Sequence, residues 1–321
     1  MTSTVSTTRP HLTSIKPVTF MLASTFNLSL SGLLSKNLST VLSYELLMLL
    51  RFCAPAALMV WLLAITDWQR PTRSSIKPIL FRSLFIALTQ LCFLYAISHL
   101  SLMESVVLFS TGPLFIPLLE KIIFNTPIKG VTLVALVMAF VGVAIQSGIG
   151  ANIDWRPELL IGVASGLFNA SGQVCMYRAA KSELSSLALN TWCMLFASVL
   201  ATGVFLLIKV DEIPAMLAGQ FEITSMISTS ALSSEGMLWV VLGVLLLSLT
   251  SINTQIFRAK AYRLVSSGAV LAPLIFTNLL FATLWQVLFF EFDWQPNKVM
   301  GMVLIISAVI LNSMLQRKNH H

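Results

Sequence analysis

The chain has 321 residues, of which 56% are hydrophobic and 10% are charged, and its formal net charge is +7. This composition predicts an integral membrane protein, because nearly every long segment is apolar enough to lie in hydrocarbon. The basic residues are spread over short connections without a clustered patch, which excludes a nucleic-acid footprint.

Ten apolar blocks are each long enough to cross a bilayer, which takes about 20 residues in a helix. In chain order we expect spans at 17–35, 42–66, 77–98, 102–124, 128–149, 158–180, 185–208, 236–257, 264–290 and 298–316. Polar tails precede and follow them at 1–16 and 317–321, and an external loop is expected near 209–236.

Positive charge sets the orientation of these spans. With the N-terminus inside, the outer connections carry only Lys36, Arg156, Lys209 and Lys298. The other cations, among them Arg70, Arg82, Arg178, Lys181, Arg258 and Arg263, fall on the inner side. The positive-inside rule then predicts that both termini are cytoplasmic.

The second set of five blocks repeats the first. The stretch from Phe93 to the Gly112-Pro113 pair aligns with the stretch from Phe257 to Pro273, and Phe26-Asn27 aligns with Phe168-Asn169. An odd number of spans per repeat inserts the two copies from opposite sides, which is the inverted-repeat plan of a secondary transporter. We therefore expect repeats at 17–149 and 150–316.

Polar residues recur inside the predicted spans at helical spacing. In the sixth span Ser165, Asn169, Gln173 and Tyr177 share one helix face, and the first span carries a similar stripe around Asn27. We expect the two stripes to face each other across the repeat axis. Further candidates for substrate binding are Gln90, Tyr95, Asn253, Gln255 and Asn278.

Such residues have two interpretations. They line a solvated cavity, or they join helix to helix with hydrogen bonds worth about 0.6 kcal/mol each. Prolines add to the first interpretation: Gly112, Pro113 and Pro273 are expected to kink the fourth and ninth spans and to act as hinges.

Arg51 is the cation that the predicted boundaries place deepest in a span, the second. An arginine near mid-membrane costs about 2.5–3.5 kcal/mol on insertion scales, so it needs a partner. It either faces the cavity and attracts an anionic or zwitterionic substrate, or it clamps a neighbouring helix.

The cysteines and histidines suggest no chemistry. Cys53, Cys92, Cys175 and Cys193 all fall inside spans without paired spacing, so we expect no disulfide, metal or cofactor. The sequence has no Gly-x-Ser-x-Gly or His-Glu-x-x-His motif, and no catalytic residue is expected. The expected partners are the lipid bilayer and a small-molecule substrate, for a monomer or homodimer.

These features resemble the drug/metabolite transporter superfamily, in particular its ten-span EamA-type branch. The likeness rests on segments in both halves: Tyr44-Glu45 through Arg51-Phe52, Phe93 to Ile97 leading to Glu104-Ser105 and Pro113, Val141 to Ala144, Ala259 to Tyr262, and Ser266 to Ala269 with Pro273. The family commonly ends its fourth span with a Gly-Glu-Arg-like run, where this chain has Leu119-Glu120-Lys121.

The resemblance implies an all-α membrane protein with ten helices in a 5+5 inverted repeat. It also implies a central cavity for amino acids, vitamins, nucleotide-like metabolites or toxic amphiphiles. We therefore expect a metabolite transporter of the bacterial inner membrane, with an exporter of toxic amphiphiles as the alternative and a channel or intramembrane enzyme as less favoured readings.

Overall fold

The computed structural model of the protein describes residues 15–99, 105, 108–127, 130–146, 157–208, 234–289 and 296–318. The elements within these ranges are helices, so the predicted all-α class is confirmed. They are α1 (Lys16–Leu38), α2 (Tyr44–Ile65), α3 (Arg73–His99), α5 (Gly112–Phe124), α6 (Gly130–Gln146), α7 (Pro157–Ala180), α8 (Ser186–Ile208), α10 (Ser234–Leu264), η4 (Gly268–Leu271), α11 (Ala272–Ile275), α12 (Thr277–Phe289) and α13 (Pro296–Lys318).

Seven segments within the described residues are long and apolar enough to cross a membrane. They are α1, α2, α3, α7, α8, α10 and the η4–α12 segment. The apolar parts of α6 and α13 are shorter, at Gly130–Ile145 and Val299–Asn312. The expected external loop lies outside the described residues from 209 to 233, and so does Glu104.

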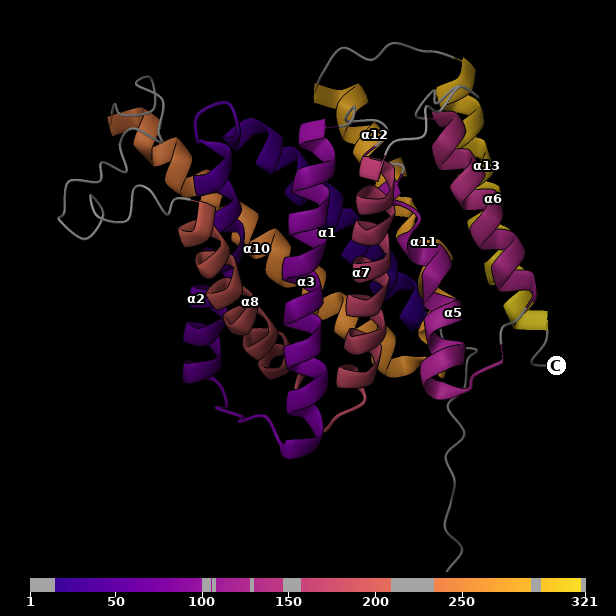
Figure 1. The fold of residues 1–321 in the computed structure, drawn as a ribbon, viewed down its shortest axis with the longest axis horizontal. Coiled ribbons are helices and arrows are strands. Elements are labelled where there is room, and N and C mark those ends of the chain that lie inside the picture. Colours follow the sequence, from indigo (N-terminus) through magenta and orange to yellow (C-terminus); the bar gives the residue numbers. More distant parts are fainter. Residues whose placement is uncertain are drawn as a thin grey trace, which may run out of the picture.

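The helices pack as pairs that join distant parts of the chain. The most extensive contacts are α3 with α7, α1 with α10, α6 with α13 and α2 with α8. Figure 1 shows α6 beside α13 at one edge of the bundle and α2 beside α8 at the other, with α3 and α7 between them. Each pair therefore takes one helix from residues 17–149 and one from residues 150–316.

Small residues let several of these helices approach closely. A Cβ added to Gly142 on α6 would lie 2.8 Å from the carbonyl oxygen of Gly301 on α13. A Cβ added to Gly166 on α7 would lie 2.5 Å from Oγ1 of Thr111 and 3.1 Å from the backbone nitrogen of Gly112. These spacings allow no side chain, as is common at helix contacts in membranes.

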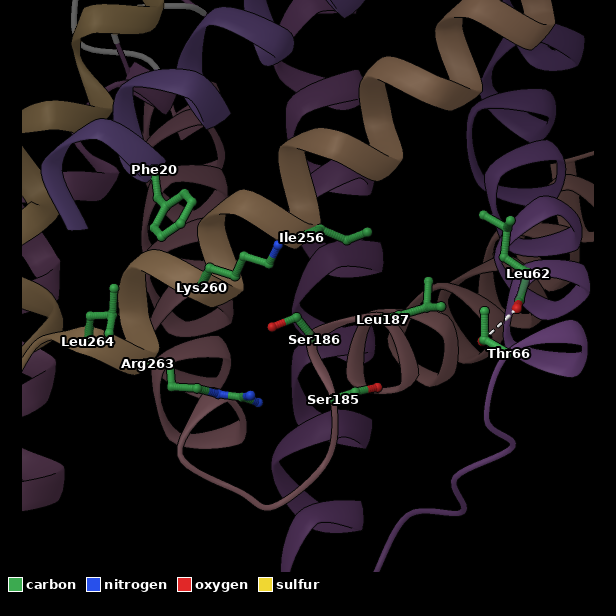
Figure 2. A pocket seen from close by; sticks show the side chains of 10 residues that line it. All are labelled: Phe20, Leu62, Thr66, Ser185, Ser186, Leu187, Ile256, Lys260, Arg263 and Leu264. Carbon is green, nitrogen blue, oxygen red and sulfur yellow. Dashed lines mark hydrogen bonds between the residues drawn. The ribbon is translucent and has the colours of Figure 1, made fainter. Parts of the chain in front are cut away.

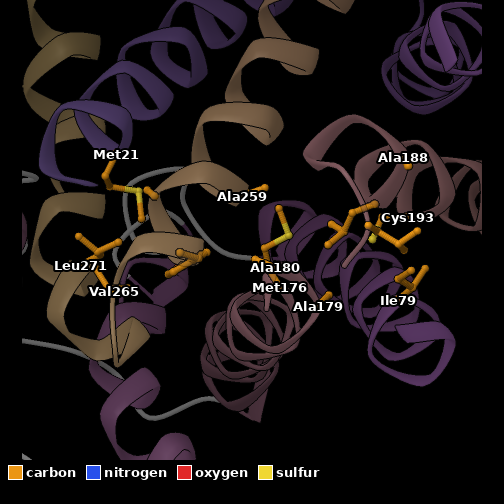
Figure 3. Packing of buried hydrophobic residues seen from close by; sticks show 14 of the residues in the cluster. Met21, Ile79, Met176, Ala179, Ala180, Ala188, Cys193, Ala259, Val265 and Leu271 are labelled. Carbon is orange, nitrogen blue, oxygen red and sulfur yellow. The ribbon is translucent and has the colours of Figure 1, made fainter. Parts of the chain in front are cut away.

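The largest buried apolar cluster joins α1, α3, α7, α8, α10 and η4 (Figure 3). Met21, Ile79, Met176, Cys193 and Leu271 belong to it, each with an exposed fraction of 1% or less. Because this cluster draws on both halves of the chain, it fixes the two halves against each other at this level of the bundle.

Two connections at the same edge of the bundle are hydrogen-bonded together. The α2–α3 and α7–α8 connections both lie along the lower edge in Figure 1. The backbone N–H of Ser185 donates to Oε1 of Gln69 at 2.8 Å, and Nε1 of Trp192 donates to the carbonyl oxygen of Gln69 at 2.9 Å. The chain therefore returns to the same side after α3, α5, α6 and α7.

The fourth and ninth spans are interrupted, though not by kinks within continuous helices as expected. Residues 110 and 111 form a turn, and α5 begins afresh at Gly112 with Pro113 in its first turn. The ninth span divides into η4, α11 and α12, and Pro273 lies in the first turn of α11. Proline fits a first turn because the N–H that it lacks has no partner there.

Candidate functional site

Arg82 is a buried cation on α3 that reaches two other helices. Its exposed fraction is 2%. Its Nη1 donates to the carbonyl oxygen of Gly172 on α7 at 3.1 Å, and its Nη2 donates to Oε1 of Gln255 on α10 at 2.6 Å. Its Nε is buried without a hydrogen-bond partner. Arg82 thus ties three helices together, and one of its three nitrogens, Nε, has no hydrogen-bond partner.

A second buried arginine, Arg258, lies beside it on α10. Its exposed fraction is 6%, and both Nε and Nη2 are buried without a hydrogen-bond partner. Its electrostatic neighbours are Tyr262 and Arg82, so the two guanidinium groups lie close enough to repel each other. Among the described residues, no carboxylate pairs with either guanidinium.

Polar groups from α7 and α8 complete this site. The Tyr262 hydroxyl donates to Oε1 of Gln173 at 3.2 Å. Asn190 on α8 donates from Nδ2 to the backbone carbonyl oxygen of Gln255 at 3.1 Å, while its Oδ1 is buried without a partner. We call Arg82, Arg258, Gln173, Gln255 and Tyr262 the arginine cluster.

The position of the two arginines corrects the sequence prediction. Both were counted among the cations of the inner side, and Arg51 was expected to be the cation deepest in a span. The structure instead buries Arg82 on α3 (Arg73–His99) and Arg258 on α10 (Ser234–Leu264), while Arg51 is exposed on α2. At a rise of 1.5 Å per residue, Arg82 lies about 14 Å into α3 and Arg258 about 9 Å before the end of α10.

A carboxylate closes the bundle near the end of α5. Glu120, with an exposed fraction of 1%, accepts a hydrogen bond from the backbone N–H of Gly268 at 2.7 Å and another from the hydroxyl of Ser267. Glu120 is therefore buried against η4, whereas the next residue, Lys121, is exposed. We call Glu120, Ser267 and Gly268 the Glu120 latch.

Two side chains from the end of α7 reinforce this closed end. The Tyr177 hydroxyl donates to the carbonyl oxygen of Ser266. Lys181, just after α7, donates from Nζ to the carbonyl oxygens of Arg263 and Val265. Partial burial lowers the pKa of Lys181, and the nearby charge of Arg263 lowers it further. Both contacts join α7 to the segment that links α10 to η4.

The structure brings three of the predicted binding residues to these two sites. Gln173 and Gln255 belong to the arginine cluster, and Tyr177 borders the Glu120 latch. Asn169 lies against Gly112, because a Cβ on that glycine would lie 3.2 Å from Nδ2 of Asn169. The sixth-span stripe therefore follows the junction of α7 with α5 and α10.

The polar residues of the first span were expected to face those of the sixth span, but their hydrogen bonds are within α1 and with α10. Nδ2 of Asn27 donates to the carbonyl oxygen of Ala23 in its own helix. Ser24 donates to the carbonyl oxygen of Thr254 on α10 at 2.9 Å, and Ser31 lies 3.4 Å from the hydroxyl of Ser251. Two hydroxyls of the first span thus bond α1 to α10, as the helix-contact interpretation expected.

The remaining predicted residues lie apart from these contacts or are placed only by their exposure. Arg51 is exposed on α2, Asn253 is exposed on α10, and Gln90 is partly buried on α3. The exposed Tyr95 ring stacks on His99 with centroids 4.2 Å apart. Oδ1 of Asn278 on α12 is buried without a partner. Substrate binding by these residues stays a prediction.

A pocket of about 590 Å³ opens between α1, α2, α8 and α10. Its lining is mainly apolar and includes Phe20, Leu62 and Ile256, together with the cations Lys260 and Arg263. Figure 2 shows Arg263 pointing toward the turn that carries Ser185 and Ser186. The Lys260 ammonium lies 5.8 Å from the centroid of the Phe20 ring. The pocket therefore combines a mainly apolar lining with two cationic side chains.

Comparisons with known proteins agree with this architecture. Residues 15–148 match the EamA-like transporter family. No curated protein matches the chain. One protein of known crystal structure aligns with a TM-score of 0.68 at 17% sequence identity, and the alignment covers 94% of this chain and 99% of the other. At that identity the likeness shows a shared fold, which extends over both halves of the chain.

Proposed function

Because residues 15–148 match the EamA-like transporter family, which is part of the drug/metabolite transporter superfamily, we propose that the chain is a secondary transporter. It moves a small metabolite, such as an amino acid, vitamin or nucleotide-like compound, across the bacterial inner membrane by alternating access. The family is generally non-enzymatic, and the protein is a multi-pass membrane protein.

The helix pairing supports a 5+5 inverted repeat at 17–149 and 150–316. In that plan α1 corresponds to α7, α3 to α10, α2 to α8 and α6 to α13. Exchanging corresponding helices turns the α1–α10 contact into the α7–α3 contact and maps α2–α8 and α6–α13 onto themselves. Contacts that are preserved under this exchange are those expected from a pseudo-two-fold axis in the membrane plane.

The contacts at the closed end support ten alternating crossings. The end of α5, the end of α7 and the α10–η4 connection meet there through Glu120 and Tyr177. Spans that alternate in direction from an inside N-terminus bring the ends of the fourth, sixth and eighth spans to the cytoplasmic side. The cations Arg178, Lys181 and Arg263 lie at this end, in agreement with the positive-inside rule.

The Glu120 latch is the observation that carries the proposal. It joins the last turns of α5, whose start at Gly112 interrupts the fourth span, to the start of η4, which interrupts the ninth span in the second half. Interrupted helices at the interface of the repeats are where carriers of this plan bend. In alternating access Glu120 releases Ser267 and Gly268, the halves separate at this end, and the arginine cluster gains access to the cytoplasm.

Counterflow in proteoliposomes tests the proposal. Vesicles loaded with pooled unlabelled metabolites should take up a trace of one labelled member by saturable exchange, because a carrier reorients with substrate on either side. Empty vesicles made with the same protein are the control. Flux that neither saturates nor depends on internal substrate would identify a channel, and a chemically altered compound would identify an enzyme.

One observation favours the alternative, an exporter of toxic amphiphiles. The pocket in Figure 2 combines an apolar lining with Lys260 and Arg263, a combination that suits an apolar compound with an anionic group. An exporter would move such a compound out of right-side-out vesicles against its gradient when a proton gradient is imposed, and counterflow with polar metabolites would be absent.

A further inference from the structure

Three nitrogens of the arginine cluster are buried without a hydrogen-bond partner. Nε and Nη2 are the two nitrogens along one edge of a guanidinium, and their parallel N–H bonds match the two oxygens of a carboxylate. On Arg258 these are the two nitrogens that are buried without a partner. Arg82 adds an unpartnered Nε from the facing helix α3. The donors that remain free are those that suit an oxyanion.

The charge balance of the site leads to the same conclusion. Two guanidinium groups with exposed fractions of 2% and 6% lie within electrostatic reach of each other. The groups around them are neutral: the backbone carbonyl of Gly172, the amide of Gln255, the thiol of Cys193 and the phenol of Tyr262. An uncompensated charge in a low-dielectric interior costs several kcal/mol, so a bound anion would stabilise this arrangement.

The rest of the protein supplies no such anion among the described residues. Glu120 is occupied by Ser267 and Gly268, and Asp67 and Glu183 are exposed in connections between helices. Glu158 lies in the first turn of α7, about 21 Å along the helix from Gly172 at a rise of 1.5 Å per residue. A ligand that brings its own negative charge is the remaining source of compensation.

We infer that Arg258 and Arg82 bind an oxyanion, a carboxylate or a phosphate, and that the transported metabolite carries this group. Arg258 takes the anion side-on through Nε and Nη2, and Arg82 adds its Nε while Gln255 and Gly172 hold it in place. The second part of this inference rests on the proposed function, whereas oxyanion binding does not.

Thermal unfolding of the purified full-length protein in detergent tests the site. Acetate and inorganic phosphate are the probes, acetamide is the uncharged counterpart of acetate, and sodium chloride at equal ionic strength is the reference. We expect acetate or phosphate to raise the unfolding midpoint in a saturable way beyond the chloride reference, and acetamide to leave it unchanged. The anion that raises the midpoint at the lower concentration shows whether the site prefers a carboxylate or a phosphate.

Variants separate binding from a structural role. Arg258→Gln should weaken the response at least about thirtyfold, as when one member of a buried charge pair is truncated, and Arg258→Lys should restore part of it. Without added anion, Arg258→Gln should unfold at the wild-type midpoint or above it, because a buried charge has been removed. Arg70→Gln, which removes an exposed arginine from the α2–α3 connection, is the matched control and should respond like wild type.

Two outcomes overturn the inference. One is a wild-type response to acetate and phosphate that does not exceed the response to chloride. The other is an Arg258→Gln protein that unfolds several degrees lower and keeps the wild-type response, since Arg258 would then be structural. Oxyanion binding without counterflow would contradict the proposed transport and leave the binding site supported. Counterflow of a neutral compound that Arg258→Gln leaves unchanged would support transport and contradict a role of the site in it.

Discussion

Glu120 accepts a hydrogen bond of 2.7 Å from the backbone N–H of Gly268, across 148 positions of sequence. A Cβ at residue 268 would lie 2.6 Å from Oε1 of Glu120, so the carboxylate approaches this closely only because residue 268 has no side chain. The contact also places a negative charge over the N–H groups that begin η4, where such a charge is favourable. Shape and charge therefore both hold the two halves together here.

Replacing Glu120 with Gln should open this end of the bundle more often. The amide keeps one acceptor oxygen but loses the charge that strengthens both hydrogen bonds, each worth about 1.5–3 kcal/mol when a charged group takes part. We expect a cysteine introduced at Ala269, in a background without the four native cysteines, to react faster with a membrane-impermeant maleimide in inside-out vesicles. Glu183→Gln, at an exposed carboxylate, is the control. Equal labelling rates in both variants would contradict the role of the latch.

Gly166→Ala should destabilise the protein. The new methyl group would meet Oγ1 of Thr111 at 2.5 Å and the carbonyl oxygen of Leu108 at 3.0 Å, and the backbone atom cannot turn away. Overpacking of this kind costs about 1–3 kcal/mol, which should lower the unfolding midpoint in detergent. Gly203→Ala on α8 is the control, because nothing lies within 4 Å of the added Cβ. If both variants unfold at the same temperature, α5 and α7 are not in close contact.

Arg51→Gln should reduce the uptake of an anionic substrate less than Arg258→Gln does. Arg51 is exposed on α2, whereas Arg258 is buried with two unpartnered donors. The measurement is counterflow of one anionic and one neutral substrate in both variants. A larger selective loss of the anionic substrate in Arg51→Gln would return Arg51 to the role in charge attraction that its sequence position suggested.

Lys181 should make stability depend on alkaline pH. Its pKa in the folded protein is lowered by burial, then by Arg263, from 10.5, so the unfolded chain binds its proton more tightly. The Lys181 contribution to the free energy of unfolding should therefore rise with pH between the lowered pKa and about 10.4, and be constant below that window. Unfolding midpoints of wild type and Lys181→Met across this range measure it. Lys77→Met, at another exposed lysine, is the control, and parallel curves for all three proteins would contradict the prediction.

Local sequence signals predicted the helices well because apolar length and proline placement act locally. The all-α class, the positions of most spans and the interruptions near Pro113 and Pro273 followed from them. The polar face of α7 was also visible in the spacing of Asn169, Gln173 and Tyr177. The assignment of that face to a site depended on which helix packs against it, and helical spacing carries no such information.

The arginine cluster could not be predicted in the same way. Arg82 and Arg258 lie near span ends, where the positive-inside rule counts cations as topological markers. A signal was present, since Arg82 lies within the block at 77–98 and a helix-forming run, Ala259-Lys260-Ala261, follows Arg258. Their burial results from packing of α3 against α7 and of α10 against α7 and α8, which are contacts distant in sequence. Asn27 shows the converse, because its regular spacing led to contacts within α1.

Helix α10 carries Arg258 on one side and Ile256 and Lys260, which line the pocket of Figure 2, on the other. Because α10 is a continuous helix over this stretch, any tilt that rearranges the buried arginines also reshapes the pocket. A compound bound in the pocket and an anion bound at the arginine cluster are then thermodynamically linked. Each changes the protein's affinity for the other by the same factor. Such a compound would act as an inhibitor or an activator without competing for the interior site.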